Sequence, residues 1–192
     1  LKQIFLAAQI PVADSKKIHQ SGKIAKLEAV ALGAITWFTG KSCTTAAELF
    51  SLLGENETFR SECPWMAGAE ELLLPLEAKE IPAWDIPSLQ PAGLSGSLLH
   101  PEHINDSYDA GVNKLTLELD TILLLIKNTP ADHEAYNSAI DRLGGRAYYS
   151  DALNAVFANS AAITVEEKAT SAYTYQHGFA PAAISFLVKG ED

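Results

Sequence analysis

The sequence predicts an all-α protein, a single-domain and irregular helical bundle that surrounds one central apolar helix at about residues 112–128. Three features lead to this prediction. The most apolar long segment is VNKLTLELDTILLLIKN, in which leucine and isoleucine recur at helical spacing. Two Thr-x-x-Glu sequences match the capping box that begins many helices. Glycines follow several segments with helical periodicity, at the position where helices commonly end.

The central segment is expected to be buried on several sides. The residues that share one stripe of this helix are Leu115, Leu119, Ile122 and Ile126. Further leucines extend the apolar surface beyond that stripe, which is typical of a helix with several neighbours. Two acidic residues interrupt the apolar run, and the run is too short to cross a bilayer, so the sequence predicts no membrane span.

The N-terminal half is predicted to contain an arm and four helices. Residues 1–22 form the arm, because a proline breaks their short apolar run, and residues 23–192 form the single helical domain. Gly40 and Gly54 are expected to end the first two helices, and Pro64 is expected to begin the fourth. The four helices cover residues 23–39, 45–54, 56–62 and 64–74.

Residues 75–101 are predicted to form an ordered, Pro-rich crossing. Five prolines divide this segment, and prolines so closely spaced prevent a regular helix. The residues between them include large apolar side chains, which a flexible linker would not carry. The segment is therefore expected to lie across the helices and to cover part of the core. Two packed halves divided here are the less favoured alternative, because each half would be small.

The C-terminal half is predicted to be helical as well. Pro101 and Pro130 are expected in first helical turns, and Ser150-Asp151 and the second capping box, Thr164–Glu167, at helix starts. These helices cover residues 101–110 and 130–143, a segment from 150 onward, and residues 164–177. Residues 182–188 form either a helix or an edge strand, because periodicity does not separate the two at this length.

The composition indicates a folded, acidic protein. Hydrophobic residues make up 47% of the chain and charged residues 20%, which is a globular balance. The formal net charge of -10 repels phosphate backbones, so nucleic-acid binding is not expected. No signal peptide or lipidation motif is recognisable, and the location is left open with the cytoplasm slightly favoured.

The two cysteines, Cys43 and Cys63, do not match a zinc-binding pattern. Neither residue belongs to a Cys-x-x-Cys sequence, so a structural zinc site is not expected. One disulfide and two buried thiols are both compatible with the sequence. No hydrolase elbow, dinucleotide-binding motif or phosphate-binding loop is present, and no cofactor is predicted.

One cluster has the residue types of a metal site. His100, His103 and Asp106 are spaced three residues apart, so His103 and Asp106 share one face of a helix that begins at Pro101. Two imidazoles and a carboxylate could bind a divalent metal ion. The more ordinary interpretation, a pair of partly exposed histidines at a helix start, is favoured because such short patterns often arise by chance.

Aromatic residues are the candidates for partner binding. They gather on both sides of the Pro-rich crossing and near the C-terminus, and such side chains are common at interfaces. The candidates are Trp65, Trp84, Tyr148, Tyr149, Tyr173, Tyr175 and Phe179. A groove lined by them on an acidic helical body would suit an amphipathic helix or an extended basic peptide. Ordinary core and rim aromatics are the favoured alternative.

The function predicted from these features is a non-catalytic protein-binding module of an adaptor, assembly or chaperone-like kind. It would act through a hydrophobic surface rimmed by acidic residues. One alternative is a metal-dependent enzyme with its site near His100, His103 and Asp106. Another is a structural subunit of a larger assembly, in which residues 1–12 act as an exchanged arm that joins copies into a homo-oligomer.

Overall fold

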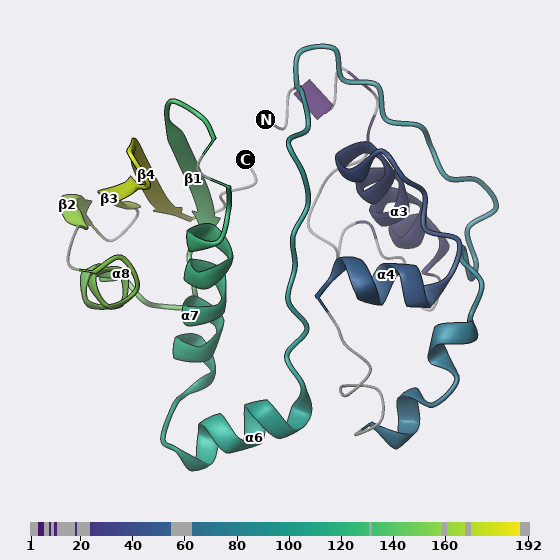
Figure 1. The fold of residues 1–192 in the computed structure, drawn as a ribbon, viewed down its shortest axis with the longest axis horizontal. Coiled ribbons are helices and arrows are strands. Elements are labelled where there is room, and N and C mark those ends of the chain that lie inside the picture. Colours follow the sequence, from purple (N-terminus) through teal and green to yellow (C-terminus); the bar gives the residue numbers. More distant parts are fainter. Residues whose placement is uncertain are drawn as a thin grey trace. The chain divides into compact units, whose positions relative to one another are not determined.

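The computed structural model describes residues 4–5, 8, 10, 18, 24–54, 63–130, 132–158, 161–167 and 170–188. The chain divides into two compact units. Unit 1 covers residues 1–98, and unit 2 covers residues 99–190 (Figure 1). Most of the predicted arm, 1–22, lies outside the described residues. The expectation of a single domain stays a prediction, because compactness alone does not establish whether either unit folds by itself.

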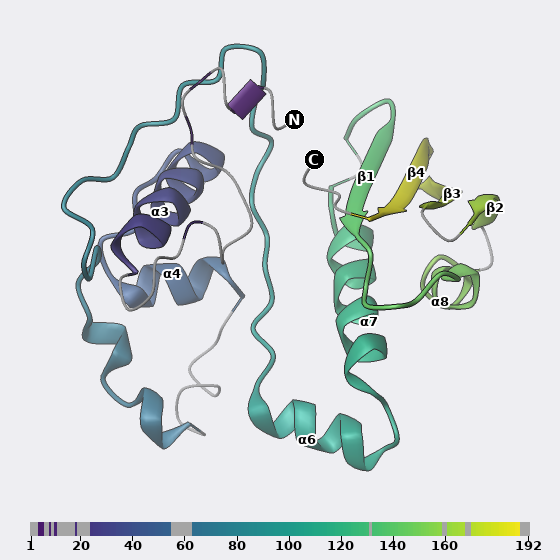
Figure 2. The ribbon, with the colours of Figure 1, turned by 180° about the vertical axis from the view of Figure 1, so that it is seen from behind.

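The all-α prediction is wrong. Unit 2 contains a four-stranded mixed sheet with the strand order β1-β4-β3-β2, which Figure 2 shows from behind. The protein is therefore an α/β fold and not a helical bundle around residues 112–128. Among the described residues, none of the helices is both long enough and apolar enough to cross a membrane.

Two helices of unit 1 have ends that follow the local sequence signals. The helix α3 covers Ala25–Thr39, and its C-cap Gly40 has a left-handed φ of 69° and donates its amide to the Thr36 carbonyl. The helix α4 covers Ala46–Leu52 and starts at a complete capping box, in which Thr45 and Glu48 satisfy each other's backbone amides. Both predicted helices are confirmed.

The helix predicted at 64–74 is replaced by two short 3-10 turns. The turn η1 covers Pro64–Met66, and η2 covers Ala69–Glu71. Gly68 lies between them with a left-handed φ of 78°, a conformation that an α-helix cannot continue through. Leu73 instead forms an antiparallel bridge with Thr45. The helix predicted at 56–62 lies outside the described residues.

The Pro-rich segment that follows packs along α3 within unit 1. The Glu28 carboxylate, in the first turn of α3, accepts hydrogen bonds from the backbone amides of Leu76, Glu77 and Ala78. The Glu77 carboxylate in return accepts one from the Ile24 amide, at 3.1 Å. These reciprocal bonds satisfy backbone amides of a segment that has no helix or strand of its own.

Unit 2 begins with two helices and continues into the sheet. The helix α6 covers Pro101–Asp109, and α7 covers Lys114–Lys127. The strands are β1 (Tyr136–Asp141), β2 (Ala162–Glu166), β3 (Thr170–His177) and β4 (Ala180–Leu187), and the helix α8 (Ser150–Val156) lies between β1 and β2 in the chain. The strand β1 pairs with β4 in parallel, and the other pairs are antiparallel.

The core of unit 2 lies between the sheet and the helices α7 and α8. Its fully buried or nearly buried members are Leu119, Leu123, Tyr149, Leu153, Phe157, Tyr173, Tyr175, Ala182, Ile184 and Phe186. The predicted helix at α7 is confirmed, but its predicted position inside a bundle is wrong. Leu119 and Leu123 are completely buried, whereas Leu124 on the same helix is 49% exposed. One side of α7 therefore faces the core, and the other faces solvent.

Two segments predicted to be helices contain strands instead, and a third segment, for which helix and strand were both possible, is also a strand. The helix predicted at 130–143 is replaced by β1, and the helix predicted at 164–177 by β2 and β3. The second capping box, Thr164–Glu167, begins no helix, because its first three residues lie in β2 and Glu167 directly follows that strand. The ambiguous segment 182–188 belongs to β4, which is an inner strand and not an edge.

Replacing Leu119 with aspartate is expected to unfold unit 2. Losing the buried side chain and burying a carboxylate should cost more than about 4 kcal/mol. All six tyrosines lie in unit 2 and all three tryptophans in unit 1, so near-ultraviolet circular dichroism can follow the two units separately. The tyrosine signal should collapse. Leu124→Asp is the matched control, and an equal loss of signal in both variants would contradict the assigned burial.

The Glu28 contacts make unit 1 sensitive to acid. Burial raises the pKa of Glu28, but the three backbone amide donors outweigh burial and hold the pKa below its usual value of 4.5. A carboxylate with a depressed pKa stabilises the folded state above its unfolded pKa, and this contribution disappears as the pH falls through the folded pKa.

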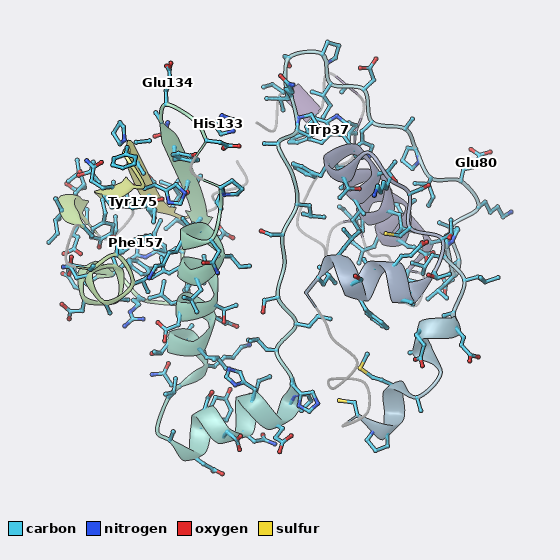
Figure 3. The ribbon with its side chains drawn as sticks, in the orientation of Figure 1. Trp37, Glu80, His133, Glu134, Phe157 and Tyr175 are labelled. Carbon is cyan, nitrogen blue, oxygen red and sulfur yellow. The ribbon has the colours of Figure 1, made fainter. Side chains whose placement is uncertain are left out.

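Glu28→Gln is therefore expected to lower the stability of unit 1 at neutral pH and to reduce its loss of stability below pH 4.5. The glutamine keeps one acceptor oxygen but points an amide group toward amide donors. Urea unfolding followed by tryptophan fluorescence at several pH values measures both effects. Exposed Glu80, labelled in Figure 3, supplies the control Glu80→Gln. Parallel pH profiles for wild type and Glu28→Gln would refute this role.

Candidate functional site

The two faces of the unit 2 sheet differ in what covers them. Side chains on one face pack against α7 and α8; Figure 3 labels Tyr175 of β3 and Phe157, the C-cap residue of α8, whose ring centres lie 4.3 Å apart. The alternate residues project from the opposite face and are exposed or half-buried. This second face consists mostly of small side chains, with alanine, serine and threonine at its centre.

A hollow of about 300 Å³ lies on this second face, at the end where β4 begins. Ala183 lies in the middle strand and pairs with Asn137 of β1 and Thr174 of β3, so a short side chain is flanked by two longer ones. Ala183 therefore forms the floor of the hollow, and Asn137 and Thr174 form its walls. The lining residues are Ala135, Asn137, Thr174, Tyr175, Gln176, Pro181, Ala182 and Ala183.

An aromatic side chain projects from the turn next to this hollow. The strands β3 and β4 are joined by the two-residue turn Gly178-Phe179. Gly178 has a φ of 61°, as the first position of a tight hairpin turn requires. The Phe179 side chain is completely exposed, with a relative accessibility of 106%. Phe179 is separated from the hollow-lining Pro181 by only one residue, so a partner seated in the hollow could also contact the ring.

Two carboxylates lie at the same end of the sheet. The strand β1 runs parallel to β4, and Tyr136 pairs with Ala182, so the residues just before β1 lie beside the β3–β4 turn. Asp132 and Glu134 precede β1, and both are exposed. Figure 3 shows Glu134 and His133 at this end of β1. The hollow, Phe179, Asp132 and Glu134 together are called the hairpin-end surface below.

Hydrogen bonds fix the loop that carries these carboxylates. The Tyr136 hydroxyl donates to the Pro130 carbonyl at 2.7 Å and accepts from the His133 amide at 2.9 Å. The buried His177 ring donates Nε2–H to the Thr129 carbonyl at 2.8 Å and meets the Tyr136 ring edge-on at 4.6 Å. The acidic loop is thus attached to both β1 and β3. His177, which has no evident partner in the sequence, anchors this loop.

The helix predicted from Pro130 would place residues 132–134 in its first turn, but these residues form a loop before β1. Asp132 and His133 precede a strand, and Asp132 Oδ1 lies 3.5 Å from His133 Nε2. Both side chains are more than half exposed. An exposed contact of this kind contributes little to stability, and the Asp132 carboxylate remains accessible at the surface.

Three of the aromatic residues predicted to bind a partner belong to the core. Tyr149, Tyr173 and Tyr175 are all buried. The Tyr173 hydroxyl donates to the Glu166 carboxylate and accepts from the Tyr149 amide at 2.9 Å. Burial, together with the bond to Glu166, raises the pKa of Tyr173 well above its usual value. The Tyr149 and Tyr173 hydroxyls both form hydrogen bonds with backbone groups of unit 2, so their polar atoms serve the fold.

The other predicted aromatics are divided between the two units. Tyr148 is 67% exposed and Phe179 fully exposed, both in unit 2. Trp84 is half-buried in unit 1, where a Cβ added at Gly33 would meet its Nε1 at 2.7 Å. Trp65 lies in η1, but its side chain is not among the described parts of the structure. The predicted role of each exposed aromatic stays a prediction.

The predicted metal ligands lie at the start of α6 without forming a binding group. His100 is the N-cap, and its Nδ1 accepts a hydrogen bond from the Glu102 amide at 3.1 Å. His103 and Asp106 are exposed on α6. Within the described ranges, no three His, Cys, Asp or Glu side chains are grouped closely enough to hold a metal ion.

The two cysteines are buried in unit 1 and are not joined in a disulfide. Burial raises the pKa of the Cys43 thiol, and the nearby Glu48 carboxylate raises it further. A thiol with a raised pKa is a weaker nucleophile at neutral pH, so Cys43 does not have the environment of a reactive cysteine.

The hairpin-end surface can make apolar contacts through Phe179 and Pro181, hydrogen bonds through Asn137 and Gln176, and attractions to positive charge. The hollow and its acidic loop were missed from the sequence. Alternation along 170–177 and 180–187 could have indicated two strands, but the hollow depends on the pairing of distant strands, which the sequence does not show. Comparisons with protein-family models, with curated proteins and with solved structures found nothing that matches this chain.

Proposed function

We propose that this chain is a non-catalytic protein-binding module, and that the hairpin-end surface binds an extended partner segment with an apolar residue flanked by basic ones. The observation that carries the proposal is the complete exposure of Phe179 beside a hollow on a rigid sheet. Aromatic side chains that become buried on binding often dominate the affinity of an interface.

The size of the hollow favours a side chain over a large ligand. A volume of about 300 Å³ lies at the lower end of small-molecule pockets. Its walls combine apolar groups from Pro181 and Ala183 with the amides of Asn137 and Gln176. One apolar partner residue could enter the hollow, while the amides accept and donate hydrogen bonds to its backbone.

Charge favours a basic partner. The whole chain has a formal net charge of -10, and Asp132 and Glu134 place two exposed carboxylates beside the hollow. Opposite charges on a partner would speed the encounter and fix its orientation, more than they would raise the affinity. This attraction should weaken as salt rises, because exposed charges are screened.

The alternative functions have less support. A metal-dependent enzyme would need His100, His103 and Asp106 to meet at one point, and the described residues contain no such group. A structural subunit joined through residues 1–12 would depend on a segment that lies mostly outside the described ranges. Neither alternative is favoured by a specific contact.

The proposal predicts which peptides the full chain selects from a display library of random short linear sequences. Selected peptides should share an apolar residue with lysine or arginine beside it. Phe179→Ala should weaken their binding by about tenfold or more, measured by isothermal titration calorimetry. Asp132→Asn combined with Glu134→Gln should weaken binding less and flatten its dependence on salt.

Ile163→Ala is the matched control, because Ile163 is exposed on β2, the strand at the opposite edge from β1. It should leave the affinity unchanged. Melting curves of each variant exclude an effect through stability. Peptides that bind Phe179→Ala and the wild type equally well, or a library that yields no basic and apolar sequences, would rule out this surface as the binding site.

A further inference from the structure

The loop between β1 and α8 concentrates positive charge in an acidic chain. The whole sequence has three arginines, and two of them, Arg142 and Arg146, lie in this loop on either side of Gly144-Gly145. Residues 142–146 are called the arginine turn below. Basic residues are few in this acidic sequence, so two arginines within five residues are a local concentration of positive charge.

Hydrogen bonds hold the arginine turn in one conformation. The Arg142 amide donates to the Leu187 carbonyl of β4 at 2.9 Å, and the Arg142 Nε donates to the Arg146 carbonyl at 2.6 Å. The hydroxyl of the buried Tyr149 donates to the same carbonyl at 3.1 Å and accepts from the Leu143 amide at 3.3 Å. The turn is therefore closed on itself and tied to both the sheet and the core.

Two further contacts position the turn. The Arg146 guanidinium lies over the Tyr149 ring, with Cζ 5.9 Å from the ring centre. Gly144 has a left-handed φ of 55°, and a Cβ added there would lie 3.3 Å from the Leu115 side chain of α7. The turn thus passes close to α7, and both guanidinium groups belong to a preorganised loop.

Some donors of the arginine turn have no acceptor among the described residues. Within the described part of the chain, no ion pair joins Arg142 or Arg146 to a carboxylate. The Gly144 and Gly145 amides make no hydrogen bond among these residues, and both glycines are exposed. The neighbouring Asp141 is the last residue of β1 and projects, by the alternation of that strand, from the face opposite the core.

We infer that the arginine turn is a binding site for an oxyanion, a phosphate-type group or a carboxylate. Arginine presents planar donors that match two oxygens of such a group, and its charge strengthens these hydrogen bonds. The adjoining glycine amides add donors in the manner of a backbone anion nest. The turn follows the end of β1, whereas the hairpin-end surface precedes its start, so the two sites lie about 20 Å apart along the strand.

The test is a titration of the full chain by two-dimensional ¹⁵N–¹H NMR at constant ionic strength. Sodium phosphate, sodium sulfate and sodium acetate are added in separate arms, with sodium chloride as the reference. The site predicts saturable shifts at the amides of Gly144, Gly145, Arg146 and Tyr149 that chloride does not produce. Saturation by phosphate and sulfate alone identifies a tetrahedral group, and equal saturation by acetate identifies a carboxylate.

Arg146→Gln is the main variant, because its side chain makes no hydrogen bond within the turn. It should weaken the tightest-binding oxyanion by about tenfold. Arg142→Gln should do the same, with tyrosine circular dichroism as the check that unit 2 stays folded. Lys127→Gln, at the exposed end of α7, should change nothing. No saturable shift beyond chloride, or shifts that persist in both arginine variants, would overturn the assignment.

Discussion

The stacking of Tyr149 on Phe186 connects the parts of unit 2. The two rings are parallel and 3.7 Å apart, and they join the segment that leads into α8 to the inner strand β4. Tyr149 also donates its amide to the Tyr173 hydroxyl on β3 and its hydroxyl to the Arg146 carbonyl. A single buried residue therefore links the helical layer, two strands and the arginine turn. In a closely packed core, even a small change at such a residue disturbs its neighbours.

This core determines which residues project from the opposite face of the sheet. The side chains that face α7 and α8 fix the register of the inner strands, and the register in turn fixes which residues project from the other face. The pairing of β4 with both β1 and β3 brings three residues into one row across the sheet, namely Asn137, Ala183 and Thr174.

Some short local signals predicted the structure correctly, although the capping box Thr164–Glu167 did not. The capping box at Thr45, the glycine after α3 and the proline at the start of α6 all have the roles that their chemistry predicts. The prediction of helices failed where the spacing of apolar residues fits both a helix and a strand. Tyr136 and Ile140 are four residues apart, which fits one side of a helix and also one face of a strand.

The environment of a helix was harder to predict than its existence. The apolar sequence of α7 predicted burial on several sides, yet Leu115 and Leu124 are exposed, because a sequence does not show which neighbours are present. The hollow was out of reach for a similar reason. It is made by residues from three strands, and only the pairing of distant segments brings them together.

The parallel pairing of β1 with β4 has a consequence for how unit 2 is made. The helix α8 and the strands β2 and β3 all come between the two partners in the chain. On the ribosome, β1 emerges first and must wait until β4 has been synthesised before it can pair. Closing this long connection is slow compared with forming the β3–β4 hairpin. The antiparallel strands therefore assemble first, and β1, together with the acidic loop before it, docks last.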